Sequence, residues 1–176
     1  MARPTHVTEN DISIRTATVN DIPAFLEYLR DLWEESLDVI YHSQKLPTQE
    51  KLEIMLTELE NQSNSCMWFA YCQDHLVGVL DLHGDQHSQR NHVAGFGMSV
   101  AKPFRGKGIG RLLLRTMLRF AEHNEQLKRI ELNVIAHNKN AIHLYESCGF
   151  SHEGRNVAAA NIKDQLRDVL MMATLL

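Results

Sequence analysis

The segment VAKPFRGKGIGR occupies residues 100–111 and carries glycine at three alternate positions, 106, 108 and 110. It connects Val93–Val100, a run typical of a strand, to a helix expected from about Gly108 to Glu125. Glycine lets a ligand come close to the backbone, and the start of a helix presents unpaired N–H groups with a partial positive charge. The segment therefore predicts an anion site, most naturally for a phosphate group.

Basic residues gather in and after this segment. Between positions 102 and 119 the chain has no acidic residue and six basic ones, which are Lys102, Arg105, Lys107, Arg111, Arg115 and Arg119. Because the whole chain has a net charge of −4, this local excess supports an anionic ligand. Arg115 and Arg119 equally fit the solvated face of a helix, and for these two residues that alternative stays open.

Two common phosphate-binding motifs do not fit the segment. The mononucleotide motif GxxxxGK[ST] is absent, and the dinucleotide fingerprint GxGxxG fails because position 111 is arginine. Glu131 does follow at about the distance of a ribose-binding acid, but a connection that contains Pro103 precedes the glycines, where a dinucleotide fold has a tight turn. The pattern that remains is RxxGxG, which spans Arg105–Gly110.

Arg105–Gly110 resembles the pyrophosphate-binding motif of the GNAT superfamily of N-acetyltransferases. A second element supports the resemblance, because Asn138–Phe150 reads NKNAIHLYESCGF and is similar to that family's NxxAxxLYxxxGF segment. One helix and one strand separate the two elements, as they do in the family. The resemblance covers residues 12–173 in the order of elements and is specific over residues 92–152.

The hydrophobic pattern along the chain predicts strands that alternate only in part with helices. Strands are expected at Ile12–Arg15, Met67–Tyr71, Leu76–Leu82, Val93–Val100, Arg129–Ile135, Phe150–Val157 and Leu166–Ala173. Helices are expected from a capping box at Thr18–Asp21 to Leu37, from Pro47 to Leu59, at Gly108–Glu125 and at Asn140–Cys148. This order favours a mixed α/β sheet over a purely parallel one. The resemblance implies an α/β (α+β) fold, with a mixed, mostly antiparallel, twisted sheet of about seven strands flanked by about four helices.

Length and composition are typical of one globular domain. The chain has 176 residues, of which 44% are hydrophobic and 23% charged, and this excludes long disorder. No apolar run approaches the roughly 18 residues of a membrane helix, and the first twenty residues have no signal-peptide pattern. The three cysteines form no CxxC pair. We therefore expect a single cytoplasmic domain over residues 1–176, with residues 1–10 as a frayed lead-in and without nucleic-acid or membrane partners.

The resemblance also implies the chemistry. Family members move an acetyl group from acetyl-CoA, their cosubstrate, to a primary amine by direct attack in a ternary complex. By resemblance, Met98 and Val100 pair their backbone with the pantetheine arm, Asn138 contacts that arm, and Tyr145 is the general acid near the sulfur. The amides that would cradle the pyrophosphate belong to Arg105, Gly106, Lys107, Gly108, Ile109 and Gly110. Gly95 and Gly97 fit a close approach of the coenzyme, although crowding inside the sheet explains them equally well.

The sequence does not identify the general base. Many family members have a glutamate in the strand before the glycine segment, whereas residues 92–98 here read HVAGFGM, without a carboxylate. The candidates are His92, Asp81, His83 and Glu131, or a chain of waters with no single base.

The acceptor also stays open, as a small-molecule or a peptide amine. We expect its site between the first two helices, the polar loop Gly84–Asn91, which has no apolar anchor and is a candidate mobile loop, and the last hairpin. Four acidic residues of the first helix region either attract a cationic amine or form a solvated face, namely Asp31, Glu34, Glu35 and Asp38.

Other functions compete with acetyl transfer at this point. A non-catalytic coenzyme A sensor is supported by the missing carboxylate. His83 and His87 have a spacing seen in metal sites, although we expect no metal, and Cys148 is a candidate nucleophile for a two-step route. A homodimer remains open as well.

Overall fold

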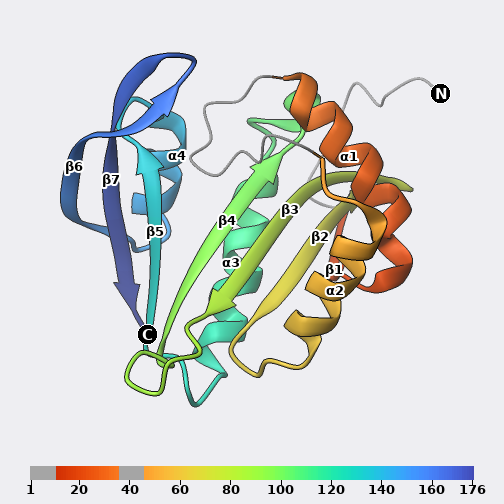
Figure 1. Cartoon of the computed structure of the whole chain (residues 1–176), viewed down its shortest axis with the longest axis horizontal. Helices are drawn as coiled ribbons and strands as arrows, with labels where there is room; N and C mark the ends of the chain where they lie inside the picture. Colours follow the sequence, from red (N-terminus) through yellow and green to blue (C-terminus); the bar gives the residue numbers. More distant parts are fainter. Residues whose placement is uncertain (1–10, 36–45) are drawn as a thin grey trace.

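The computed structural model describes residues 11–35 and 46–176, which contain a seven-stranded sheet with helices on both faces (Figure 1). The strands are β1 (Ile12–Thr16), β2 (Cys66–Cys72), β3 (His75–Gly84), β4 (Val93–Val100), β5 (Arg129–Ile135), β6 (Ser151–Ile162) and β7 (Gln165–Leu175). The α-helices of these residues are α1 (Ile22–Glu34), α2 (Gln49–Glu60), α3 (Ile109–Glu122) and α4 (Lys139–Glu146). The strand order is β1-β2-β3-β4-β5-β7-β6, and every neighbouring pair is antiparallel except β4–β5. The expected mixed, mostly antiparallel sheet with four helices is confirmed.

Successive side chains of the inner strands point to opposite faces of the sheet, and this divides the core into two layers. In β2, Trp68 and Ala70 pack toward α3, whereas Met67 and Phe69 pack toward α1 and α2. Both layers are well filled, since Phe69, Leu113 and Met117 have no exposed surface. Figure 1 shows α1 and α2 on one face of β1–β4 and α3 on the other.

The structure corrects several expected bounds. The last two strands are longer than Phe150–Val157 and Leu166–Ala173, because β6 and β7 pair as far as Ile162 and Gln165. β6 is almost wholly exposed, and its pairing with β7 is irregular at two places. Apolar and polar residues therefore do not alternate along its sequence with period two. The expected end of the first helix at Leu37 lies outside the described residues, as do Asp38 and the lead-in 1–10.

The capping box before α1 is confirmed and belongs to a larger polar cluster. The backbone N–H of Thr18 donates to Asp21 Oδ2 at 2.8 Å, and the hydroxyl of Tyr71 donates to Asp21 Oδ1 at 2.9 Å. Asp21 is only 5% exposed and also pairs with Arg15. The Arg15 guanidinium, followed by these other donors, holds the pKa of Asp21 well below its usual value despite burial.

The feature that positions the site is the parting of β4 and β5. These parallel strands pair only from Val93↔Arg129 to Gly95↔Glu131. Beyond that point β4 continues beside β3 as far as Val100, and β5 continues beside β7 as far as Ile135. Figure 1 shows the two strands separating toward their C-terminal ends.

Candidate active site

A cleft of about 810 Å³ opens where β4 and β5 part. Strands β3, β4 and β5 form its floor, α1 and α2 supply apolar side chains such as Phe25 and Met55, and α4 contributes Tyr145. The cleft brings together residues that are far apart in the sequence, among them Asp81, Met98 and Asn138. One continuous space is thus bordered by predicted coenzyme residues and by candidates for the general base.

Beyond Gly95, no strand of the described residues pairs with the β5 side of β4, so this edge can pair with a ligand along the cleft. The carbonyl of Val93 and the N–H of Ala101 form hydrogen bonds on the β3 side. Since backbone groups alternate sides along a strand, Phe96, Met98 and Val100 direct theirs toward the gap. This is the placement expected for Met98 and Val100, although the Val100 carbonyl already accepts from Arg105 Nε at 2.8 Å.

The glycine segment forms the start of α3. Gly106 and Gly108 have φ of 73° and 83°, and Gly108 is the N-cap residue of the helix. Such backbone favours glycine because a Cβ would be strained there. Within the described chain, the N–H groups of residues 106–110 have no hydrogen-bond acceptor, so five consecutive donors are available to an anion.

Arg105 departs from the expected arrangement. Its N–H donates to the Lys102 carbonyl at 3.3 Å, so it is not among the available donors. Its guanidinium pairs with Glu35, which also accepts from the Lys102 N–H at 3.1 Å. Glu35 therefore links the end of α1 to the glycine segment and does not point to a cationic substrate. Sequence reasoning missed this pair because 70 residues separate its members.

Three other members of the segment have packing roles. A Cβ on Gly110 would lie 3.0 Å from Leu144 Cδ2 and 3.5 Å from Met98 Cε, so glycine allows α3 to approach both α4 and β4. Lys107 places its ammonium group 5.4 Å from the centre of the Phe104 ring. The side chain of Ile109 is buried in the core.

Tyr145 lies at the border between the core and the cleft. Its ring makes an edge contact with Phe96, with 5.7 Å between the ring centres, and another with Phe150. Burial raises the pKa of Tyr145 to about 12. Across residues 11–35 and 46–176 its hydroxyl has no hydrogen-bond partner. A protonated hydroxyl that reaches a cleft from a buried ring can donate a proton to a developing anion.

Asn138 is the N-cap residue of α4, and its Oδ1 accepts from the N–H of Ala141 at 3.2 Å. The helix therefore uses the side-chain carbonyl, which leaves the side-chain NH₂ as a donor for another group. Asn138 lines the cleft. Its capping role and a contact with the coenzyme arm are compatible.

The four candidates for the base have different surroundings. Asp81 and His83 line the cleft and are joined by a hydrogen bond of 2.8 Å between Oδ2 and Nε2. Glu131 also lines the cleft but is paired with Arg90 and Arg129 at 3.2 and 3.0 Å. His92 is exposed and, within the described residues, does not line the cleft. Among the four candidates, Asp81 and His83 are therefore the two that line the cleft and are bonded to each other.

The loop after β3 has polar anchors that its sequence does not reveal. Asn64 is buried and donates to the carbonyls of Asp85 and Asn91, both at 3.2 Å. Arg90 bonds Asp85 at 2.8 Å and reaches Glu131 on β5. Hydrogen bonds thus hold the expected mobile loop at both ends. Among the described residues that line the cleft, none belongs to this loop or to the last hairpin.

Two competing sites find no support in the geometry. Across the described ranges no three His, Cys, Asp or Glu side chains converge as metal ligands, and His83 is engaged with Asp81. Cys148 follows α4 and is not among the residues that line the cleft in the described chain. Among the described helices, none is long and apolar enough to cross a membrane.

Comparisons with known proteins agree with this geometry. The model of the acetyltransferase (GNAT) family matches residues 26–150. The chain is 33% identical over 98 residues to the L-amino acid N-acetyltransferase AaaT of Escherichia coli, covering 56% of this chain and 60% of that protein. It is 34% identical over 100 residues to the spermidine N(1)-acetyltransferase of Vibrio cholerae, covering 57% of each. The matched region thus spans about 60% of the length of these curated relatives.

Similarity to solved structures extends over nearly the whole chain. The crystal structure of a GNAT-family acetyltransferase from Streptococcus pneumoniae superposes with a TM-score of 0.86 and 27% identity. The superposition covers 94% of this chain and 99% of that one.

Proposed function

The chain belongs to the acetyltransferase (GNAT) family, and from this premise we propose that it moves the acetyl group of acetyl-CoA to a primary amine by direct attack in a ternary complex. The observation that carries the proposal is the cleft between β4 and β5. In the described chain it joins an unpaired edge of β4 and the hydroxyl of a buried tyrosine to a space large enough for a second substrate, and unpaired amides at the start of α3 provide an anion site.

The residues present fit the coenzyme. The amides of residues 106–110 bind the pyrophosphate at the start of α3, where the partial charge of the helix is positive. Met98 and the N–H of Val100 pair with the pantetheine arm at the β4 edge, and Asn138 donates to it through its side-chain NH₂. The Arg105 side chain holds Glu35 and the Val100 carbonyl, so its role is to order the segment.

The reaction requires that the amine lose a proton and that the departing sulfur gain one. An alkylammonium with a pKa of about 10 must lose a proton before its nitrogen can attack the thioester carbonyl. As the C–N bond forms and the C–S bond breaks, a backbone N–H of β4 stabilises the oxyanion, and Tyr145 protonates the departing thiolate. Because the pKa of Tyr145 is raised to about 12, its hydroxyl keeps its proton throughout the neutral range.

We propose a small amine as the acceptor. The names of the two curated relatives refer to L-amino acids and to spermidine, both of which are small amines. Apolar side chains of α1 and α2 form one wall of the cleft, and Asp81 lies on its floor. This combination suits an ammonium group attached to an apolar chain.

The test is thiol release from acetyl-CoA in the presence of pooled amines, namely polyamines, amino acids, aminoglycosides or short peptides. We expect release above the rate without amine in a pool of small amines, and the active pool identifies the acceptor class. If every pool fails while coenzyme A binds, the chain is a coenzyme A sensor or acts on a protein, and the proposal of a small acceptor is wrong.

Initial-rate measurements test the direct route. Varying both substrates should give intersecting double-reciprocal lines, and Cys148→Ala should keep the turnover number of the parent. Parallel lines together with an inactive Cys148→Ala variant would establish a two-step route through the thiol.

A further inference from the structure

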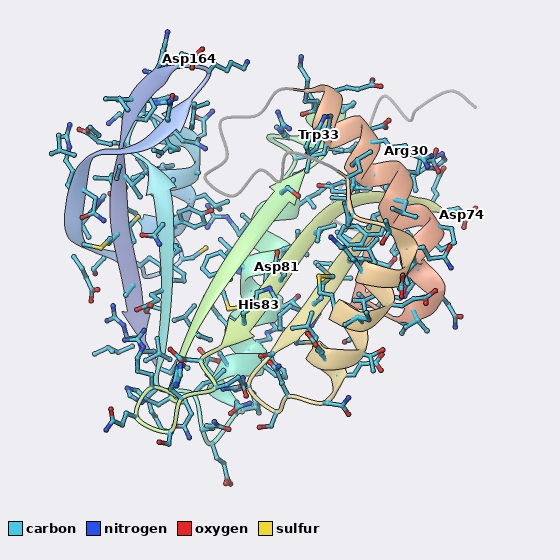
Figure 2. The ribbon with its side chains drawn as sticks, in the orientation of Figure 1. Arg30, Trp33, Asp74, Asp81, His83 and Asp164 are labelled. Atoms are coloured by element: carbon cyan, nitrogen blue, oxygen red, sulfur yellow. The ribbon has the colours of Figure 1, made fainter. Side chains whose placement is uncertain are left out.

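Two side chains on β3 form a linked acid–base pair on the floor of the cleft. Asp81 and His83 are two residues apart on one strand, so both project from the face that α1 and α2 cover. His83 Nε2 and Asp81 Oδ2 are 2.8 Å apart. Figure 2 shows the two side chains next to each other in front of β3 and β4.

Glycines on the neighbouring strand leave this pair uncovered. In the β3–β4 register Asp81 lies opposite Gly97, and His83 lies opposite Gly95. A Cβ at position 97 would come within 3.0 Å of Asp81 Oδ1, so glycine is what allows the carboxylate to lie there. Of the atoms in the described residues, a Cβ at position 95 would meet only the Glu131 carbonyl, at 3.8 Å, so these residues leave the space beside His83 open.

We propose that His83 is the catalytic base that takes the proton from the acceptor ammonium, directly or through one water, and that Asp81 is its positioning residue. This inference rests on the proposed acetyl transfer and adds a residue that performs one of its steps. With the Nε2–H donating to Asp81, the lone pair is on Nδ1 and is available to the substrate.

The other acidic or basic groups around the cleft are less suited to this step. Two arginines pair with Glu131 and occupy both of its oxygen atoms. The further titratable side chains that line the cleft in the described chain are Lys51 from α2 and Tyr145 from α4. Tyr145 cannot accept a proton near neutral pH, because its pKa is raised.

The protons balance along this route. His83 Nδ1 takes one proton from the ammonium and releases it to solvent, to which its half-exposed side chain has access. The amine nitrogen then bonds to the thioester carbon, and the second proton that it loses replaces the one that Tyr145 gives to sulfur. The products are one amide, one thiol and one proton.

Electrostatics support the assignment. The hydrogen bond to Asp81 raises the pKa of His83 above its usual value of 6.5, although burial opposes this rise. A stronger base requires higher pH to be deprotonated, so the acid limb of the pH profile should lie above 6.5. Loss of Asp81 should move that limb toward lower pH.

The experiment compares four purified variants with the parent in the thiol-release assay across pH. His83→Ala and Asp81→Asn test the pair. His75→Ala, an exposed histidine on the same strand, and Asp74→Asn, in the turn before it, are the matched controls. If His83→Ala does not fold by circular dichroism, His83→Gln replaces it.

We expect His83→Ala to lower kcat about 100-fold at pH 7, with the KM for acetyl-CoA changed less than about twofold. Added imidazole should restore part of the rate, and the difference from the parent should shrink as pH approaches the pKa of the amine, because free amine then needs no base. Asp81→Asn should lower kcat about 10-fold and move the acid limb to lower pH. Both controls should match the parent.

Each alternative result overturns the inference. If the parent transfers acetyl but His83→Ala keeps its kcat and pH profile, His83 is not the base, while the proposed function stands. If His83→Ala loses the same fraction of activity at every pH and imidazole has no effect, the role of His83 is structural. If the parent transfers acetyl to no amine, the proposed function and this inference both fail.

Discussion

The properties of Tyr145 could be predicted from the sequence only in part. Its motif, NxxAxxLYxxxGF, predicted a tyrosine near the reacting sulfur, and the structure adds a hydroxyl at the border of the cleft. The raised pKa could not be predicted, because it arises from burial among Phe96, Phe150 and the core. The sequence gives the type of a residue directly, whereas the loss of water around its side chain depends on how the whole chain folds.

Replacing Tyr145 with phenylalanine should therefore separate chemistry from binding. The ring contacts remain in Tyr145→Phe, but the proton donor is lost, so kcat should fall about 100-fold while the Kd for acetyl-CoA changes less than about twofold. Steady-state kinetics and calorimetry measure the two quantities. Tyr71→Phe is the control, since it loses a hydroxyl that bonds to Asp21 outside the cleft. Equal turnover in Tyr145→Phe would remove the tyrosine from the acid role.

Asp21 should contribute to stability through its partners. Asp21→Asn removes the charge that Arg15, Tyr71 and the Thr18 N–H surround, so the free energy of unfolding should fall by about 2–3 kcal/mol at pH 7. Because the pKa of Asp21 is lowered by folding, this contribution is complete above its ordinary value of 3.8 and is lost as pH falls below it.

Urea unfolding at several pH values measures this contribution, with Asp74→Asn as an exposed control. The difference between the parent and Asp21→Asn should narrow below the ordinary carboxyl pKa of 3.8. A difference that stays constant down to low pH would show that the effect comes from packing and not from charge.

Among the elements, the start of α3 was the easiest to predict and the last hairpin the hardest. Alternate glycines between an apolar strand and an amphipathic helix are a local signal, and the left-handed Gly106 and Gly108 agree with it. The lengths of β6 and β7 depend on pairing between exposed residues, for which no hydrophobic pattern exists. The same holds for Arg105 and Glu35, whose contact is made only when α1 packs near the glycine segment.

Gly108→Trp tests the anion site at the start of α3. The indole would fill the space in front of the unpaired amides, so calorimetry should detect no binding of coenzyme A. Gly149→Ala is the matched control, because Gly149 has a φ of 93° in the turn after α4 and carries similar backbone strain. Retained affinity in a folded Gly108→Trp variant would place the pyrophosphate elsewhere.

At the scale of the whole molecule, the sheet consists of two parts that join over only three residue pairs. The mostly antiparallel sheet of about seven strands followed from the sequence pattern and the resemblance, but the separation of β4 from β5 did not. Neither residues 93–100 nor residues 129–135 contain a proline, which would interrupt pairing, so the sequence of neither strand specifies where its pairing with the other stops. The parting depends on how each strand pairs on its other side, with β3 and with β7.

Binding of coenzyme A where β4 and β5 separate should protect the amides at the free edge of β4 from hydrogen exchange. We expect slower hydrogen exchange at the amides of Phe96, Met98 and Val100 when coenzyme A is present, because a ligand that pairs with the edge removes them from water. The amides of β1, at the far edge of the same sheet, serve as the control. Unchanged exchange in β4 with saturating coenzyme A would rule out pairing along this edge.

The most direct test of acetyl transfer is the mass of the amine after reaction. The chain is incubated with acetyl-CoA and the amine pool that gives the highest thiol release, and the amine is analysed by mass spectrometry. We predict one acetyl group on a primary nitrogen for each thiol released, and none when the chain is omitted. Thiol release without an acetylated amine would mean that water is the acceptor, and it would contradict the proposed function.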